Sequence, residues 1–556
     1  MRFLESSAAL AALAVVGEAS TPAGHVHAVR PASLLQRRGP QVFPRDWQPD
    51  VENWGAAPEQ PNEITVQAET EAKTPVTSVG APPIRLSVSQ DALQNDIDSA
   101  ALLDHAENLQ AIAYQTTGRN RVFGSPGHNF TTLYLYELIS QLDEYYDVEY
   151  QPFIETFSGG DATLTVNGED QQAELMTYAP NGQVEAPIVA VSNLGCEPSD
   201  FPAEVSGAIA LISRGTCDFG LKAAYAGAAG AAGAVIYNNV NGSLSGTLGA
   251  PNRTEGTYPP TAAISLSNGR AILALLEAGE VTGDLNVNSI IEDRVTMNVI
   301  AQTKAGDPDN VIFVGAHSDS VEAGPGINDN GSGSIGILEV ALKLAKYEVN
   351  NAVRFAWWSA EEFGLLGAEY YVNQTTPEDL DKIRLYLNFD MIASPNYFLG
   401  IYDGDGSAFN LSGPAGSAEA EALFEGYFAS KELPSQPTEF SGRSDYGPFL
   451  DVGVAAGGLF TGAEQVKTEA EAALYGGTAG LAYDENYHRV GDTVDNLNLE
   501  AFLINTRAIA HAVATYADSF DSLPARSQRV VRRSPLVPKA RATGCHHKHA
   551  EEATAR

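Results

Sequence analysis

Apolar runs alternate with amphipathic segments along the second half of the chain. Residues 311–317 (VIFVGAH), 353–358 (VRFAWW) and 384–392 (RLYLNFDMI) are short and largely apolar, which is typical of buried strands. Residues 334–347 and 499–520 place apolar side chains three or four positions apart, which predicts amphipathic helices. Their stripes are Ile335, Leu338, Leu342 and Ala345 in the first helix and Phe502, Ile509, Val513 and Tyr516 in the second. The alternation indicates an α/β fold with a mixed, largely parallel central sheet flanked by helices.

The pattern changes twice along the chain, which predicts an interrupted domain. Residues 86–155 contain helices around a loop at 119–129 (RNRVFGSPGHN) and end in a strand near 147–153. Residues 156–295 have short β runs and many small residues, which predicts a β-rich insert with a small-residue helix between two strands. The strand–helix alternation resumes over 296–522, which we take as the second part of the interrupted domain.

Composition narrows the class of protein. The chain has 556 residues, of which 44% are hydrophobic, so it can build more than one well-packed domain. Its formal net charge of −37 would repel the phosphates of nucleic acid, which excludes nucleic acid as a partner. Such a charge suits a soluble protein in an acidic or extracellular setting.

Both ends of the chain carry processing signals. Residues 1–19 have one Arg followed by a short apolar core and small residues, which predicts a secretory signal peptide that is too short to span a membrane. Residues 20–85 lack apolar periodicity and contain Arg37 and Arg38, which predicts the prosegment of a zymogen or a flexible mature N-terminus. Residues 523–556 are basic and lack periodicity, which predicts a disordered or trimmed tail. We therefore expect a secreted protein that is not membrane-bound, with the vacuolar lumen as the alternative.

Cysteines and glycosylation signals agree with that route. Cys196 and Cys217 are close in sequence and can form a disulfide in an oxidising compartment, which leaves Cys545 in the tail. Asn330 fits the glycosylation pattern, but we expect it to lie beside the active site and stay unmodified. The predicted glycosylation sites are Asn129, Asn241, Asn252, Asn373 and Asn410.

Imidazole and carboxylate groups follow the predicted strands. The first strand ends in His317, the second leads into Glu361 and Glu362, and the third ends in Asp390. Because ligands gather at the carboxyl ends of parallel strands, these groups should meet at one edge of the sheet. Asp329, in the Gly-flanked loop GINDNGSG, and His488, in the polar loop DENYHRVGDT, offer two more such groups. Each residue alone has an ordinary structural explanation, but a site for two divalent cations such as Zn²⁺ accounts for all of them at once.

The ordered motifs AHSDS, NDNGSG, SAEEFGLLGA, NFDMI and YHRVGDT resemble those of the co-catalytic zinc aminopeptidases that include aminopeptidase Y and secreted fungal leucine aminopeptidases. The resemblance covers roughly 86–155 and 296–520, and the insert resembles a protease-associated domain. It implies a zinc exopeptidase fold, two Zn²⁺ per chain, and peptide substrates with a free N-terminus, often with Leu or another apolar residue first. We expect the enzyme to be monomeric.

The resemblance also implies the role of each site residue. Asp329 bridges the two metals, His317 and Asp390 complete one site, and Glu362 and His488 complete the other. Glu361 is the general base that takes a proton from the attacking water and later passes it to the leaving amine, which explains why two glutamates are adjacent. Asp319 orients an imidazole that binds metal. Tyr487 contacts the developing oxyanion, and Arg443 contacts substrate, unless Arg443 is an ordinary ion-paired loop residue. A cysteine pair that some relatives carry around the Tyr-His pair is absent here.

Two other functions use the same scaffold. A non-catalytic, receptor-like relative would be expected to lack ligands or base, and this chain retains them all. A carboxypeptidase or dipeptidase would need a basic pocket for a substrate carboxylate, and the segments around the site supply only Arg443 and Arg489. Serine chemistry is disfavoured because the chain has no G-x-S-x-G motif.

Overall fold

A mixed sheet forms the centre of the domain that carries the predicted site. The computed structural model describes residues 85–249 and 253–525. The four central strands are parallel, β15 runs antiparallel to β17, and β10 runs antiparallel to β13. In sheet order the strands are β16 (Gln436–Thr438), β15 (Gly400–Tyr402), β17 (Ala456–Phe460), β14 (Ile383–Phe389), β11 (Asp307–His317), β13 (Asn351–Trp358) and β10 (Thr282–Thr303). The predicted α/β class with a mixed, largely parallel sheet is confirmed.

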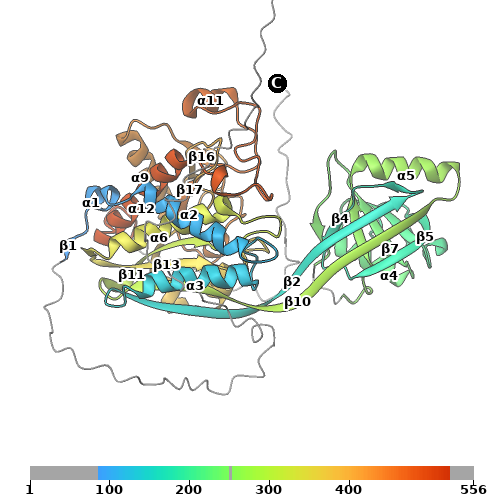
Figure 1. Ribbon diagram of the computed structural model, residues 1–556, viewed down its shortest axis with the longest axis horizontal. Helices are drawn as coiled ribbons and strands as arrows, with labels where there is room; N and C mark the ends of the chain where they lie inside the picture. Colours follow the sequence, from blue (N-terminus) through green and yellow to red (C-terminus); the bar gives the residue numbers. More distant parts are fainter. Residues whose placement is uncertain (1–84, 250–252, 526–556) are drawn as a thin grey trace, which may run out of the picture. The chain divides into compact units, whose positions relative to one another are not determined.

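Helices cover both faces of this sheet (Figure 1). One layer packs against β11, β13 and β17, and the other packs against β11, β14 and β17. The first layer contains α6 (Gly333–Leu344), α9 (Ser417–Ser430) and α12 (Leu499–Asp518), with α1 (Gln90–Asn95), α2 (Ser99–Tyr114) and α3 (Pro126–Ser140) packed on them. The second layer contains α7 (Leu366–Gln374), α8 (Pro377–Lys382) and α10 (Tyr446–Asp451). The remaining helix of this domain is α11 (Glu469–Tyr475), and β1 (Leu86–Ser87) pairs with β12 (Tyr347–Glu348).

The start of α3 corrects the sequence prediction of a loop over 119–129. The hydroxyl of Ser125 accepts a hydrogen bond from the backbone N–H of His128, and Pro126 occupies the first turn, where its missing N–H costs nothing. The helix therefore begins inside the segment that we predicted as loop. It also contains Asn129, whose side chain is only 8% exposed. A glycan at Asn129 would require the start of this helix to open, and glycosylation there stays a prediction.

The insert has its own parallel sheet and its own core. β5 (Gly182–Ala190), β6 (Ile209–Ser213), β7 (Gly233–Tyr237) and β9 (Thr261–Ile264) are parallel neighbours. α4 (Phe219–Ala228) is the predicted small-residue helix between β6 and β7, and it packs against β7 through buried alanines. The other elements are β4 (Glu174–Thr177), β8 (Gly246–Thr247), α5 (Leu266–Ala278) and two short 3₁₀ turns, η3 (Pro198–Asp200) and η4 (Ala203–Val205). The core is made mainly of Ala, Val, Ile and Leu side chains of these elements.

Two long paired strands connect the insert to the catalytic domain. β2 (Tyr146–Val166) pairs with β10 over its whole length, from Tyr146 opposite Thr303 to Val166 opposite Gly283, and ends in a short pairing with β3 (Glu169–Asp170) (Figure 1). At one end β10 also pairs with β13, and at the other with β5. The predicted boundaries at 155/156 and 295/296 thus fall inside continuous strands. We call this pair, residues 146–166 with 283–303, the connecting ribbon.

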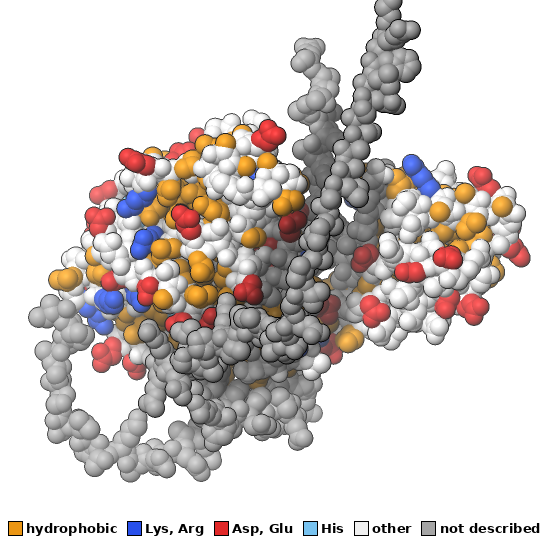
Figure 2. Space-filling model, turned by 45° about the horizontal axis from the view of Figure 1, so that its top comes forward, with side chains coloured by type: hydrophobic (Ala, Val, Ile, Leu, Met, Phe, Trp, Pro, Cys, Tyr) orange, Lys and Arg blue, Asp and Glu red, His pale blue; other side chains and the backbone are white. Residues whose placement is uncertain are grey.

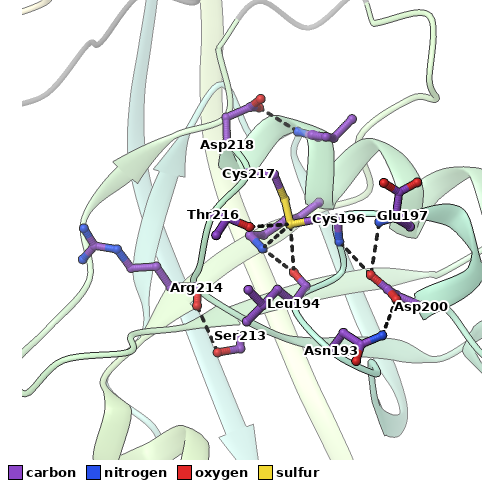
Figure 3. Close-up of a disulfide and its surroundings, with 12 residues drawn as sticks. Asn193, Leu194, Cys196, Glu197, Asp200, Ser213, Arg214, Thr216, Cys217 and Asp218 are labelled. Atoms are coloured by element: carbon purple, nitrogen blue, oxygen red, sulfur yellow. Dashed lines mark hydrogen bonds between the residues drawn. A yellow bond between two sulfur atoms is a disulfide. The ribbon is translucent and has the colours of Figure 1, made fainter.

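The predicted disulfide is confirmed. Cys196 and Cys217 are joined by an Sγ–Sγ bond of 2.09 Å, which ties the loop after β5 to the start of α4 (Figure 3). The carboxylate of Asp200 accepts hydrogen bonds from the backbone N–H groups of Cys196 and Glu197. The buried Lys222 donates to the carbonyl of Leu194 beside the bridge. The disulfide therefore lies in a loop that is already well ordered by polar contacts.

Acidic side chains are scattered over the described surface on the face shown in Figure 2, whereas Lys and Arg occupy fewer places. Asn241, Asn373 and Asn410 are exposed, so these predicted glycosylation sites are accessible, and Asn330 is buried as expected. None of the described helices combines the length and apolar composition needed to cross a bilayer. The predicted signal peptide, most of the prosegment, Asn252, Cys545 and most of the tail lie outside the described residues.

Candidate metal centre

Three neighbouring parallel strands bring polar side chains to one edge of the catalytic sheet. β11 ends at His317, Glu361 and Glu362 follow β13, and Asp390 follows β14. The Nε2 atom of His317 lies 3.4 Å from Oδ1 of Asp390 and 3.7 Å from Oε2 of Glu361. The three strand ends thus place an imidazole and carboxylates within contact distance, as the strand-end argument predicts.

Asp329 lies between two histidines. It belongs to η5 (Ile327–Ser332), a short turn that leads into α6. Its Oδ1 atom is 3.3 Å from Nε2 of His317, and its Oδ2 atom is 3.1 Å from Nε2 of His488. The same nitrogen of His488 is 3.0 Å from Oε2 of Glu362. The structure therefore brings all five predicted ligands together, with one oxygen of Asp329 facing each histidine.

Among the described residues, several buried polar atoms of this cluster lie close to charged neighbours but form no hydrogen bond of acceptable geometry. They are both ring nitrogens of His317, Nε2 of His488, Oε1 of Glu362 and Oδ1 of Asp390. Leaving such an atom unpaired costs about 1–3 kcal/mol. Imidazole nitrogen and carboxylate oxygen are the donors that Zn²⁺ accepts in catalytic sites, so this donor set fits bound divalent cations. One possible ligand atom from each of His317, Asp329 and Glu362 lies within 4.8 Å of the others, and the same holds for His317, Glu361 and Asp390.

The charges of the cluster also favour a bound cation. Burial raises the pKa of Glu361 well above its usual value; His317 opposes this shift, and Asp390 adds to it. Burial opposes a charge on His317, but Asp390 and Glu361 hold its pKa well above the usual value. Without a cation these groups would compete for a few protons. A bound divalent ion would instead favour ionised carboxylates and neutral imidazoles.

Asp319 holds both His317 and Glu361 in place. Its Oδ1 atom lies 3.4 Å from Nδ1 of His317, so the other ring nitrogen is directed towards Asp329 and Asp390. The same oxygen accepts a hydrogen bond of 3.1 Å from the backbone N–H of Glu361. This position suits the orienting role that we predicted for Asp319, and it adds a contact to Glu361 that the sequence did not suggest.

Tyr487 and Arg443 are connected in the structure. The ring of Tyr487 stacks on that of His488 at a centroid distance of 3.8 Å. Arg443 donates a hydrogen bond of 3.3 Å to the hydroxyl of Tyr487 and forms an ion pair of 2.9 Å with Glu464. Arg443 thus forms an ion pair and also contacts a predicted oxyanion donor, and its contact with substrate stays a prediction.

Several residues that support the ligands were not predicted from the sequence. Asp492 accepts hydrogen bonds from the backbone N–H groups of Asn328 (2.7 Å) and Asp329 (3.0 Å), which ties the loop of His488 to the turn of Asp329. Burial and the neighbouring Asp484 raise the pKa of Asp492 to about 8. The hydroxyl of Ser444 donates to Oδ2 of Asp390 at 2.6 Å. The signal for Asp492 was its position in the segment DENYHRVGDT that contains His488, and the signal for Ser444 was its position next to Arg443.

Two family models match the chain. The model of peptidase family M28 matches residues 298–513, and the PA domain model matches residues 184–272. The second match lies between β2 and β10, which confirms the prediction of a protease-associated insert. The first covers every predicted ligand and Glu361.

Fungal proteins are similar over most of their length. "Probable leucine aminopeptidase 2" of Aspergillus fumigatus is 54% identical over 460 residues, which cover 81% of this chain and 92% of that protein. "Probable leucine aminopeptidase 2" of Aspergillus oryzae is 52% identical over 84% of this chain and 97% of that protein. "Leucine aminopeptidase 2" of Trichophyton rubrum is 51% identical over 84% of this chain and 94% of that protein.

Solved structures share the fold. An aminopeptidase from Aneurinibacillus sp. strain AM-1 superposes with a TM-score of 0.61 at 26% identity, over 80% of this chain and 98% of that chain. A zinc aminopeptidase from Bacillus subtilis superposes with a TM-score of 0.56 at 22% identity, over 77% of this chain and 99% of that chain. The central sheet and its flanking helices therefore belong to a fold already seen in solved structures.

Proposed function

Because the chain belongs to peptidase family M28 and is a zinc-dependent aminopeptidase, we propose that it hydrolyses the first peptide bond of peptides and proteins with two zinc ions. Asp329 would bridge the two ions, His317 and Asp390 would hold one, and Glu362 and His488 would hold the other. The observation that carries this proposal is the placement of Asp329, whose two oxygens each face a different histidine at 3.3 and 3.1 Å. A ligand that serves a single ion would have no need of that arrangement.

Bound zinc supplies polarisation of the scissile carbonyl and lowers the pKa of the attacking water. Glu361 takes the proton of that water and delivers it to the leaving amine. Its buried carboxylate lies 3.7 Å from His317 and is held through its backbone by Asp319, so it is close to the reacting atoms without being needed as a ligand. Tyr487 donates its hydroxyl proton to the developing oxyanion. Arg443 donates to the oxygen of Tyr487, which leaves the proton of that hydroxyl available for substrate.

The charges of the site favour a substrate with a free N-terminus. The α-ammonium group of such a substrate is attracted by the carboxylates around the metals. A carboxypeptidase would need a basic group facing the substrate, but Arg443 is paired with Glu464 and Arg489 lies on an exposed loop. This contrast supports removal of residues from the N-terminus and disfavours the carboxypeptidase and dipeptidase alternatives.

The fungal relatives named leucine aminopeptidase support a preference for Leu and similar apolar residues at the first position. The Cys196–Cys217 disulfide and the exposed Asn241, Asn373 and Asn410 support secretion of a glycosylated enzyme. The leader with its dibasic pair, Arg37 and Arg38, supports synthesis as a zymogen. We propose the medium as its compartment, with the vacuolar lumen as the alternative, and a monomeric enzyme.

The purified mature protein assayed on a panel of aminoacyl substrates tests the function. We expect hydrolysis of leucyl substrates with a free amine, no hydrolysis of their N-acetylated forms, loss of activity with a chelator, and recovery on adding zinc. Elemental analysis should find two zinc ions per active chain. Equal activity on free and N-blocked substrates, or full activity without metal, would refute the proposal.

A further inference from the structure

We propose that Arg121 is a positioning residue that sets the zinc affinity of the metal centre by holding the loop between His317 and Asp329. The inference rests on the proposed zinc site and adds a residue that contacts neither metal nor substrate. Arg121 lies between α2 and α3, more than 190 positions before the first ligand in the sequence, and its side chain is 0% exposed. A buried guanidinium is costly unless its donors are satisfied, so its contacts indicate what it stabilises.

The guanidinium of Arg121 donates to three backbone carbonyls of one loop. Nε donates to the carbonyl of Pro325 at 2.7 Å, Nη1 donates to that of Ser318, and Nη2 donates to that of Gly326. The backbone of Arg121 makes two further contacts, because its N–H donates to the hydroxyl of Ser320 (2.9 Å) and its carbonyl accepts from the N–H of Ser320 (3.2 Å). Arg121 therefore holds the loop of residues 318–326 near its start, at Ser318 and Ser320, and at its end, at Pro325 and Gly326.

This loop determines where the ligands lie. It begins directly after His317, contains Asp319, which orients His317 and Glu361, and ends three residues before Asp329. Gly326 has a φ of +61°, and a Cβ there would come within 2.3 Å of the carbonyl oxygen of Asp329. Gly326 thus packs directly under the bridging ligand while its carbonyl is held by Arg121. A shift of this loop would move His317 and Asp329 relative to each other.

Arginine suits this task better than lysine. Its planar guanidinium offers five donors in a fixed arrangement, whereas a lysine amine is a single point charge that cannot reach three separated carbonyls together. Asp319, Asp329 and Glu362 lie close enough to attract the charge of Arg121. Within the described residues, however, the guanidinium donates only to backbone carbonyls. The carboxylates therefore remain available for metal, and the geometry of the guanidinium, not only its charge, carries the effect.

Zinc titration of the metal-free enzyme against a chromophoric chelator tests the inference without relying on activity. Arg121→Lys keeps the charge and loses the planar fork, and Arg121→Met loses both. We expect both variants to bind zinc about 10- to 100-fold more weakly than the wild type, the range typical of residues that orient metal ligands. With zinc at saturation, kcat should fall while KM stays within about twofold, since Arg121 does not contact substrate.

Arg354 supplies a matched control, because it is a half-buried arginine of β13 that donates to the side chains of Gln302 and Tyr371. Arg354→Lys should lower the melting temperature and leave zinc affinity unchanged. If Arg121→Met fails to fold, Ser320→Ala is a milder variant, because it removes only the hydroxyl that accepts from the backbone N–H of Arg121. It should weaken zinc binding about threefold. Wild-type zinc affinity in Arg121→Lys would overturn the inference, as would an equal loss of affinity in Arg354→Lys. Wild-type protein that binds no zinc would refute the proposed function itself, and the inference with it.

Discussion

Polar residues end the parallel strands of both the catalytic sheet and the insert, but they are satisfied in different ways. In the insert, Arg214 follows β6 and donates to Asn238, which follows β7 and also accepts from two backbone N–H groups. Ser265 follows β9 and caps α5. In the catalytic sheet, the strand-end groups of His317, Glu362 and Asp390 include buried atoms without partners. Strand ends therefore collect polar residues in both sheets, but among these strand-end residues the buried atoms without partners lie at the edge of the catalytic sheet.

The largest expected effect is the loss of turnover at the catalytic domain in Glu361→Gln. The amide cannot accept the proton of the attacking water, so we expect kcat to fall about a thousandfold, within the range for loss of a general base. Zinc content should not change, because Glu361 is not a ligand. Steady-state kinetics and elemental analysis measure the two quantities. Glu185→Gln, on β5 of the insert, is the matched control and should leave both unchanged; near-normal turnover in Glu361→Gln would remove Glu361 from the mechanism.

Removing the metal should lower the stability of the catalytic domain and leave the stability of the insert unchanged. A ligand present at about a thousand times its Kd stabilises the folded state by about 4 kcal/mol, which corresponds to roughly 8–16 °C in melting temperature for a domain of this size. We expect a chelator to lower the calorimetric transition of the catalytic domain by this order and to leave that of the insert in place. A chelator that shifts both transitions equally, or neither, would contradict the assignment of the unpaired groups to metal binding.

Removing the disulfide should lower the stability of the insert and not that of the catalytic domain, because the disulfide lies in the insert. Replacing Cys196 and Cys217 by serine opens a bridge with a sequence separation of 21 residues. A bridge of this span contributes about 3 kcal/mol in the chain-entropy account. We expect the transition of the insert to fall while kcat on a leucyl arylamide stays within about twofold of the wild type. A large loss of kcat would show that the insert supports the metal centre directly.

The smallest effect is expected from the titration of histidine, and it should spare the insert. All ten histidines of the chain lie outside residues 129–316, so the insert has none. Burial, with a smaller contribution from Lys343, lowers the pKa of His105 from 6.5 to about 4. The unfolded chain therefore binds a proton that the folded chain excludes, and stability is lost as the pH falls from about 6.5 towards 4.

His105→Gln removes that contribution while keeping a polar partner for the hydroxyl of Tyr134. The variant should lose less melting temperature than the wild type between pH 7.5 and pH 5, as measured by calorimetry with the chelator present to exclude effects of metal binding. Parallel curves for the two proteins would show that His105 does not contribute to the acid sensitivity.

The sequence predicts three parallel strands of the catalytic sheet (311–317, 353–358 and 384–392), the five grouped ligands and the disulfide. Each of these depends on a local pattern, on the shared edge of parallel strands or on the family resemblance. The strands β10, β15, β16 and β17 were not predicted. The sequence predicts burial less well. Leu342 and Ala345 lie on the predicted stripe of α6 but are only half-buried, whereas residues 333–341 are buried on every side because α2, α12 and the sheet all pack on this helix. The contacts of Arg121 and Asp492 with the ligand loops join segments that are 163 or more positions apart, and no periodicity in one sequence reveals such pairs.

The connecting ribbon has a consequence for how the chain can be cut. Every residue of β2 faces a partner on β10, so a tight two-residue turn that joins the strands between opposite pairs, such as Ser158 and Ile291, would close the hairpin without leaving loose ends. Such a deletion would yield a minimal peptidase, and the excised segment could be grafted onto any other protein that offers two neighbouring antiparallel strands. A module attached in this way can be gained or lost by a single event in a gene while the catalytic residues keep their positions.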